Sequence, residues 1–381
     1  MSFSMKVEQV ELMKALNSLK NSTGKGKLTP YEKYLRLEMK LEPGNRHLLM
    51  LQTCNGGDFK ELHFHVLDGT DGVSPLIEFD KLYRIVSTVD PMSEITMTQV
   101  DTMIKFDYTG RREPIMFNGV DSELFPRKPD LTKGNTMELE YDVLLAALEF
   151  CSPYLSTESP NAILNCMSVK IESQKIQFTA IDNTNKRFVY GECPTTSLTP
   201  GEFLVEVSAL KKMFAGFSPK AKIDINMSET HITLSQPHIQ TSLRQIAGAF
   251  PDITKNVLKP CPISLSMNKH ELLSALDRVK VFVDEHDYKA RIVNVKFNNM
   301  LTSISLKSQL GELEEAITTQ SNSGELEMSF LVDSFYQSVK SIDSDEINFG
   351  FYAKNNAILT PKIPSSRYQD QRVLVQAIQL D

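Results

Sequence analysis

One short pattern occurs three times along this chain, at residues 11–16, 143–148 and 271–276. Each copy is an apolar run that ends in the pair Ala-Leu, and the later copies lie 132 and 260 residues after the first. A spacing this regular indicates a chain built from three copies of one structural unit. We therefore predict three domains, at residues 1–134, 135–260 and 261–381.

Each repeat has the same predicted order: a strand, a helix, three strands, a strand, a second helix and three more strands. In the first repeat, the later strands are expected at residues 34–41, 47–54, 61–67, 77–79, 94–98, 102–107 and 114–118. The helices are expected at residues 8–20, 80–89, 141–151, 208–216, 268–282 and 333–342. Asp80, Ser208 and Asp333 are the expected N-caps of the second helices. This order predicts an α+β fold, with two helices on one face of an antiparallel sheet in each domain.

The composition is that of a folded globular protein. Of the 381 residues, 41% are hydrophobic and 23% are charged. No apolar run is long enough to cross a bilayer, and the charged N-terminal segment differs from a signal peptide, so we expect a cytoplasmic protein without a membrane partner. The five cysteines form no CxxC pair, which favours reduced core thiols over disulfides or zinc ligands.

A linear array of three sheet-bearing units leaves unpaired strand edges on its first and last members. Exposed edges invite aggregation unless something covers them. Pairing the first repeat of one copy with the third repeat of another covers both edges and closes a ring. We therefore predict a head-to-tail homodimer with six similar domains.

Positive charge concentrates on the predicted helices. The net charge of −7 argues against a protein that binds nucleic acid over its whole surface, although it is compatible with a local basic surface. Arg84 and Lys212 occupy equivalent positions on the second helices, where the third repeat has Gln337. For any single lysine, a solvated surface position is the alternative. The repeated placement predicts a polyanion inside the ring, held through its phosphates.

Four motifs and an apolar C-terminal strand give the chain its family resemblance. The motifs are Leu-Asn-Cys-Met at 164–167, Thr-Ala-Ile-Asp at 179–182, Arg-Phe at 187–188 and Gly-Ala-Phe-Pro-Asp at 248–252. With them, essentially the whole chain resembles the bacterial sliding clamp family, the beta subunit of DNA polymerase III.

The resemblance implies a ring of two three-domain subunits around duplex DNA, with helices lining the hole. It implies a DNA processivity factor that is not an enzyme and needs no cofactor. Its expected partners are double-stranded DNA, a DNA polymerase III alpha-type polymerase and a separate ATP-driven clamp loader. The alternative is a ring-shaped interaction platform that does not encircle DNA.

The resemblance also assigns a DNA-facing surface. The loop at residues 24–27 lies where the family places a basic loop near DNA. It lacks the spacing of a nucleotide-binding phosphate loop, and a solvated loop is its alternative interpretation. The expected DNA-facing residues are Lys14, Lys20, Lys25, Lys27, Lys81, Arg84, Lys211, Lys212, Arg278, Lys280 and Lys340.

A peptide-binding groove is expected between the second and third repeats and the C-terminal tail. The segment 183–186 makes the loop before Arg187 two residues longer than the usual family pattern, and the tail sequence also departs from it. We therefore expect a groove of altered shape, and a core strand is the alternative interpretation of the tail. The expected wall residues are Leu164, Ile181, Arg187, Phe188, Pro251, Val257, Leu374, Val375, Gln376, Ala377, Ile378 and Leu380.

The resemblance places the subunit interface at two apolar pairs. Ile115 and Phe117 alternate so that they share one face of an edge strand. In a partner copy, they are expected to meet Val281 and Phe282 at the end of the first helix of the third repeat.

No pattern of catalytic residues stands out. His63 and His65 share a face of a predicted strand, but no third ligand lies nearby in sequence, so surface histidines are preferred over a metal site. The chain has no nucleophile elbow, HExxH motif or glycine-rich dinucleotide turn. An enzyme site formed between repeats is the competing hypothesis of a different class.

Overall fold

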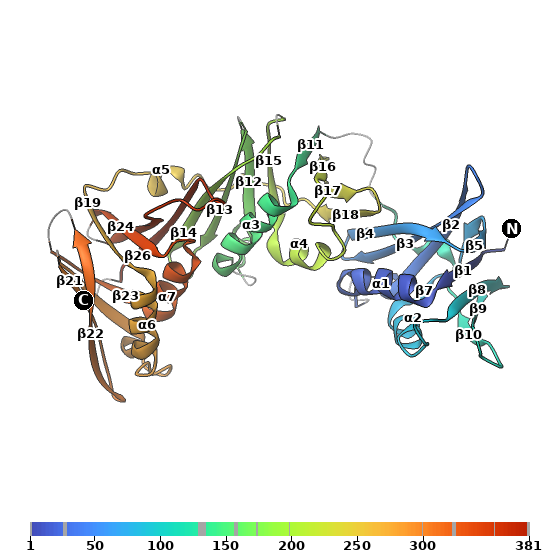
Figure 1. Ribbon diagram of the computed structural model, residues 1–381, viewed down its shortest axis with the longest axis horizontal. Coiled ribbons are helices and arrows are strands. Elements are labelled where there is room, and N and C mark those ends of the chain that lie inside the picture. The colour runs from blue at the N-terminus through green and yellow to red at the C-terminus, as the bar shows by residue number, and fades with distance from the viewer. Residues whose placement is uncertain are drawn as a thin grey trace. The chain divides into compact units, whose positions relative to one another are not determined.

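The structure is a computed structural model, and it describes residues 2–25, 29–128, 135–155, 159–172, 174–197, 199–298, 300–321, 325–353 and 355–378. Contacts divide the chain into two compact units, which we describe separately. Unit 1 contains Met1–Tyr141 and Ser208–Gln245, and unit 2 contains Asp142–Val207 and Ile246–Asp381 (Figure 1).

Unit 1 holds two antiparallel sheets. The five-stranded sheet has the order β10-β9-β8-β1-β5, with β10 at one edge. Its strands are β1 (Ser4–Glu8), β5 (Asp68–Thr70), β8 (Glu94–Val100), β9 (Met103–Tyr108) and β10 (Ile115–Asn118).

The nine-stranded sheet of unit 1 has the order β11-β16-β17-β18-β4-β3-β2-β6, and β7 also pairs with β2. Strand β4 pairs with β18 from Leu62 opposite Ile239 to Phe59 opposite Ser242, so segments far apart in sequence share this sheet. The strands are β2 (Tyr34–Glu42), β3 (Arg46–Asn55), β4 (Asp58–Val66), β6 (Gly72–Val73), β7 (Ile77–Glu78), β11 (Asn135–Leu139), β16 (Ile223–Met227), β17 (His231–Gln236) and β18 (Ile239–Arg244).

Helices α1 (Gln9–Leu19) and α2 (Phe79–Val86) pack against each other in unit 1 (Figure 1). The buried face of α1 contains Leu12, Ala15, Leu16 and Leu19, at the spacing of an amphipathic helix. The helix α4 (Val207–Met213) begins at the last residue of unit 2 and continues into unit 1. The repeated pattern at residues 11–16 is therefore a core-facing stripe, and Lys14 lies exposed on its other side.

A buried ammonium ties three elements of unit 1 together. Lys60 on β4 is fully buried, and its Nζ donates to the carbonyls of Ser18 at 2.8 Å and Ala215 at 2.6 Å. These carbonyls lie at the end of α1 and after α4, where a positive charge is favourable. Gly216 has φ +89°, and a methyl group there would come within 2.9 Å of Ser18. The two helix ends thus approach closely over Lys60, and burial lowers the pKa of Lys60 to about 7.

Unit 2 is built on one twelve-stranded antiparallel sheet. Its order is β15-β12-β13-β14-β26-β25-β24-β19-β22-β21-β20-β23. The strands are β12 (Cys166–Glu172), β13 (Lys175–Asp182), β14 (Arg187–Pro194), β15 (Gly201–Glu206), β19 (Ile263–Asn268), β20 (Ile292–Phe297), β21 (Leu301–Ser308), β22 (Gly311–Ser321), β23 (Leu326–Leu331), β24 (Glu346–Ala353), β25 (Asn356–Pro361) and β26 (Asp370–Gln376).

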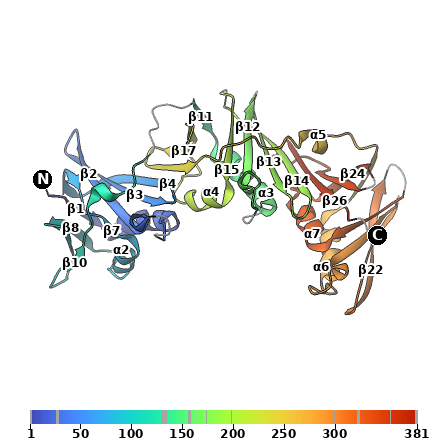
Figure 2. The same ribbon diagram turned by 180° about the vertical axis from the view of Figure 1, so that it is seen from behind.

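Four helices accompany this sheet. They are α3 (Tyr141–Cys151), which starts at the unit boundary, α5 (Thr254–Val257), α6 (Lys269–Lys280) and α7 (Val332–Ser341). Helices α6 and α7 pack against each other, and they lie side by side in both views (Figures 1 and 2). The short helix α5 lies on the other face of the sheet from α3 and α7 (Figures 1 and 2).

The predicted order of elements is confirmed for the second and third repeats. The first repeat has two additional short strands, β5 and β6. The prediction of one sheet per repeat is wrong, because the strands of the middle repeat are divided. Its strands β12–β15 belong to the sheet of unit 2, whereas β11 and β16–β18 belong to the nine-stranded sheet of unit 1.

The three predicted N-caps are also wrong. The helices start earlier, at Phe79, Val207 and Val332, because in each case the preceding strand runs directly into the helix. The N-cap residues of α2 and α7 are Glu78 and Leu331, and neither side chain caps its helix. The three expected caps, Asp80, Ser208 and Asp333, each lie at the second helical position instead. The two carboxylates still suit the positive end of the helix dipole there.

Candidate peptide groove and nucleic-acid interface

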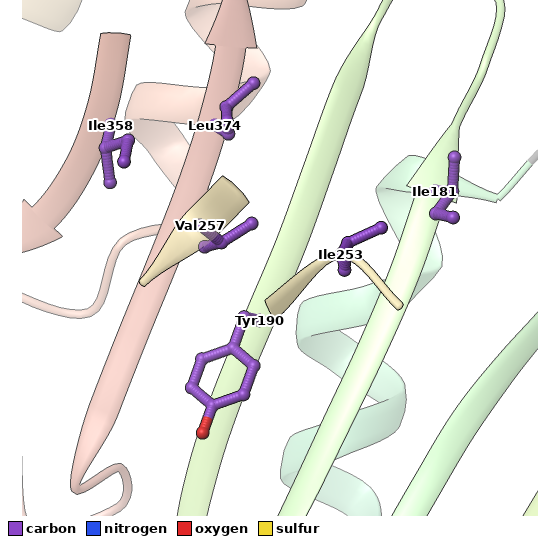
Figure 3. Packing of buried hydrophobic residues seen from close by; sticks show 6 residues of the cluster. All are labelled: Ile181, Tyr190, Ile253, Val257, Ile358 and Leu374. Carbon is purple, nitrogen blue, oxygen red and sulfur yellow. The ribbon is translucent and has the colours of Figure 1, made fainter. Parts of the chain in front are cut away.

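An apolar cluster lies on the face of the unit 2 sheet that α5 covers. One row of residues crosses four neighbouring strands, with Ile181 opposite Phe188, Phe188 opposite Leu374, and Leu374 opposite Ile358. Tyr190 lies two residues along β14 from Phe188 and therefore shares its face. Figure 3 shows Ile253 and Val257 lying over these strands.

The cluster brings together five of the expected groove residues from distant parts of the sequence. Ile181, Val257 and Leu374 are buried in it, and Leu164 and Phe188 pack against it while partly exposed. Pro251 is exposed two residues before Ile253. Asp252 holds the start of α5, since its Oδ1 accepts from the backbone N–H of Thr254 at 3.0 Å. The Thr254 hydrogen bonds also lower the pKa of Asp252.

Arg187 lies apart from this cluster because it occupies the opposite face of the sheet. Its row runs from Asp182 through Arg187 to Val375, one residue away from the apolar row. The guanidinium is buried, pairs with Asp182, and donates to the Ser334 carbonyl at 3.3 Å. It also stacks over the Tyr154 ring, 4.8 Å from the centroid. Arg187 therefore braces the β13–β14 hairpin against α7.

The C-terminal tail lines a separate hollow of about 410 Å³ in unit 2. Backbone hydrogen bonds fix the tail: Ala377 donates to Asn355 at 2.8 Å, and Ile378 donates to Ser329 at 2.7 Å. Leu380 lies outside the described residues. The hollow is lined by Thr184, Asn185, Lys186, Tyr288, Leu331, Ser334, Asn355, Val375, Gln376, Ala377 and Ile378.

The expected DNA-facing side chains are mostly exposed, but they differ in their electrostatic surroundings. Three of them pair with carboxylates: Lys81 with Glu78 at 2.8 Å, Arg278 with Glu315 at 2.5 Å, and Lys280 with Asp333 at 2.8 Å. The hydrogen bond from Arg278 lowers the pKa of Glu315. These pairs reduce the positive potential that the three cations present to a ligand.

The remaining cations have no carboxylate partner among the described residues. Lys20 lies over the Tyr83 ring at 4.8 Å and Lys340 over the Tyr336 ring at 6.0 Å. The others are exposed, and Lys27 lies outside the described residues. The exposed cations without a carboxylate partner in the described chain are Lys14, Lys25, Arg84, Lys211 and Lys212.

The expected interface residues lie beside two unpaired strand edges. Strand β10 ends its sheet, and Phe117 on it is buried against Phe106, with ring centroids 5.9 Å apart. In β22, residues 311–318 pair only with β21 within the described chain, because pairing with β19 starts at Thr319. Val281 is 72% exposed, and Phe282 packs over Gly311 at the start of β22.

Nothing in the described part of the chain suggests metal binding or thiol chemistry. It contains no group of three or more His, Cys, Asp or Glu residues arranged to hold a metal. His63 contacts the Pro237 carbonyl at 2.5 Å and His65 contacts Glu42 at 3.0 Å, so the two imidazoles have separate partners. The five cysteines are unpaired, and burial raises the pKa of Cys54 to about 11. The described helices include none with the length and apolarity needed to cross a membrane.

Comparison with known proteins gives consistent matches. A family model described as DNA polymerase III beta subunit, C-terminal domain, matches residues 261–372. The beta sliding clamp of Bacillus subtilis is 21% identical over 268 residues, which cover 68% of this chain and 69% of that protein. The chain belongs to the beta sliding clamp family. The prediction of a non-enzymatic sliding clamp related to DNA polymerase III beta is therefore confirmed.

Solved sliding clamps share the fold over the full length of this clamp. The DNA polymerase III subunit beta of Pseudomonas aeruginosa matches with a TM-score of 0.87 at 16% identity, covering 99% of this chain and all (100%) of that one. The DNA polymerase III beta chain of Streptococcus pneumoniae matches with a TM-score of 0.87 at 17% identity, covering 100% of both chains. The predicted α+β class is confirmed by these matches.

Sequence reasoning missed two positions in this clamp. Lys60 has a clear structural signal, a lysine in an otherwise half-apolar strand, but its burial depends on α1 and α4 converging from distant segments. Lys186 has a signal in sequence, since it ends the two-residue extension at 183–186, and the structure places it at the hollow lined by the tail.

Proposed function

We propose that this clamp acts as a DNA processivity factor: two copies close head to tail into a ring around duplex DNA and tether a polymerase to it. The observation that carries this proposal is the pair Arg84 and Lys212. Both are exposed at equivalent helix positions and have no carboxylate partner in the described chain. Such charges attract phosphates at every register without reading base sequence, which suits a sliding contact.

Ring closure would join the free edge of β10 in one copy to the free segment of β22 in the other. Antiparallel pairing would satisfy the backbone groups that each edge leaves open. Val281 supports this arrangement, because a 72% exposed valine beside a free strand edge gains most from being covered. The three predicted domains, at residues 1–134, 135–260 and 261–381, would then contribute six domains to the ring.

The apolar cluster and the tail-lined hollow together form the proposed peptide groove. Apolar walls with a few polar groups suit a short anchored peptide. The proposed users are a DNA polymerase III alpha-type polymerase and a clamp loader, which would work in the cytoplasm. Tethering keeps a released polymerase at high effective concentration near its template, so rebinding becomes intramolecular.

The decisive experiment loads the clamp on nicked circular DNA, cuts the DNA once, and measures the protein that remains bound. A topologically linked ring slides off free ends, so we expect retention on circles and loss after linearisation. Uncut circles incubated with inactive nuclease are the control. Equal retention on both forms would contradict encirclement and favour an interaction platform that does not encircle DNA.

A further inference from the structure

We propose that the tail-lined hollow selects a partner segment carrying an acidic residue next to its apolar anchor, with Lys186 as the specificity-determining residue. This inference rests on the proposed peptide-binding function of the groove. It adds the chemistry of the partner: a carboxylate in the hollow of about 410 Å³ and an apolar side chain at the neighbouring cluster.

The charge of the hollow is one-sided. Lys186 is the single charged residue among the described residues that line it; the others are apolar, hydroxyl, phenol or amide side chains. Lys186 is exposed and forms no ion pair within the described chain. A lone ammonium at the mouth of a hollow favours an anionic partner and repels a cationic one.

The nearest carboxylate does not cancel this charge. Asp182 is buried and already accepts from Arg187 at 3.0 Å and from Asn185 at 2.8 Å. The Asp182 carboxylate is therefore neutralised by the Arg187 guanidinium on the other face of the sheet. Lys186 remains the dominant charge on the side that a partner can approach.

The backbone holds Lys186 in place at the end of the extended loop. Its φ is +52°, and its carbonyl accepts from the backbone N–H of Gln376 at 3.2 Å. The Asn185 backbone N–H donates to Asp182 at 3.0 Å, which fixes the residue before it. The side chain thus extends from an anchored position, and less ordering is needed when a carboxylate binds.

Further donors surround the proposed carboxylate position. The Gln376 side-chain amide and the Tyr288 hydroxyl both line the hollow, and neither makes a hydrogen bond within the described chain. Tyr288 is 58% exposed, so its hydroxyl is accessible. An ammonium, an amide N–H and a phenol O–H together suit the two oxygens of a carboxylate.

The spacing between the acidic residue and the anchor follows from β26. Leu374 belongs to the apolar cluster and Gln376 lines the hollow, two residues further along the same strand. Two residues of extended chain span roughly 7 Å. A partner segment in extended conformation would therefore carry its acidic residue about two positions from its apolar anchor.

The test uses two series of fluorescent peptides, X-Ser-Leu-Leu and Leu-Leu-Ser-X, which cover both chain directions. In each series X is Glu, Gln or Lys, and binding to the full chain is measured by anisotropy. In the better-binding series, we expect the Glu peptide to bind about three- to fivefold more tightly than the Gln peptide, and the Lys peptide most weakly. The Glu preference should shrink as salt is raised.

Variants of the chain assign the effect to Lys186. In Lys186→Gln the Glu and Gln peptides should bind equally, at the wild-type affinity for the Gln peptide, and Lys186→Glu should reverse the preference. Lys289→Gln, an exposed lysine outside the lining, is the matched control and should keep the preference. Equal binding of Glu and Gln by the wild type, or a preference that survives Lys186→Gln, would overturn the inference while leaving peptide binding intact. Failure of every peptide to bind would instead contradict the groove function itself.

Discussion

Lys60 shows how one residue can serve two helix ends at once. Its ammonium lies without a carboxylate in a fully buried position and contacts two carbonyls at chain reversals. Burial of a charge is costly, which is why the pKa of Lys60 falls to about 7 from its usual 10.5. The price is a stability that depends on pH.

The sign of that dependence follows from the protons bound by each state. Between about pH 7 and 10.5 the unfolded chain keeps the Lys60 proton and the folded chain loses it, so stability rises with pH. Below about pH 7 both states are protonated, and Lys60 adds no pH dependence. We expect the wild type to gain roughly 1 kcal/mol per pH unit relative to Lys60→Met between pH 7 and 9. Urea unfolding of both proteins at the two pH values measures this.

An exposed strand lysine supplies the control for this measurement. Lys105→Met on β9 should show the same pH dependence as the wild type, because Lys105 is exposed in the folded state. If Lys60→Met also follows the wild type, the ammonium is not desolvated as the structure indicates.

At the scale of elements, the first helix of a repeat is tied to the end of the second by its first residue. In the first repeat, the Gln9 amide donates to the Val86 carbonyl at 2.9 Å. In the third repeat, the equivalent Lys269 donates to the Ile342 carbonyl at 2.6 Å. The same orphan carbonyl of a helix end is satisfied by two different side chains. The repeat thus preserves the contact and not the residue.

The order of elements could be predicted because hydrophobic periodicity is local. Leu12, Ala15 and Leu16 repeat at helical spacing, and their burial follows from that pattern alone. Sheet membership could not be predicted in this way, since β4 pairs with β18 across most of the first two repeats. Nothing in a single strand records which distant strand it will join.

The candidate groove was predictable to a similar extent. Family motifs indicated Ile181, Phe188 and Leu374, which lie in one row of the sheet. Arg187 was assigned to the same wall, but its neighbour Phe188 faces α5 while Arg187 faces α7. One residue of register separates the two faces of a strand, and a sequence motif does not specify which face a ligand uses.

The proposed dimer contact can be tested at Val281. Val281→Glu should yield monomers with little change in thermal stability, because the side chain is 72% exposed in the single chain and only a partner would desolvate the new charge. Sedimentation velocity and a melting curve check both parts. Met92→Glu, at a residue that is 92% exposed, is the control and should leave the mass unchanged.

Phe117 is a poorer site for the same test. It is 7% exposed and packs edge-to-face on Phe106, so a charge there should lower the melting temperature of the single chain. A dimer that persists in Val281→Glu at low micromolar concentration would contradict the proposed edge pairing.

At the scale of the whole molecule, a net charge of −7 must coexist with DNA binding. The cations without a carboxylate partner in the described chain determine where that is possible. We expect Lys212→Glu and Arg84→Glu each to shorten retention on circular DNA. Each should also reduce the slope of log affinity against log salt by about one, as expected for the loss of one phosphate contact.

Lys296→Glu on β20 provides the comparison for this salt titration. Lys296 is exposed on a strand, so the same change of net charge should leave the slope nearly as in the wild type. An equal loss for the strand and helix variants would indicate a general charge effect and not a DNA-facing helix surface.

The division of the middle repeat has a consequence for synthesis on the ribosome. Strand β4 leaves the ribosome early, yet its partner β18 begins only at Ile239. Between them the ribosome delivers residues 142–207, which belong to the other compact unit. The open side of β4 must therefore wait, exposed, through the translation of foreign sequence. The nascent chain is expected to need protection from wrong pairing during that interval, and a fragment that ends before β18 should aggregate.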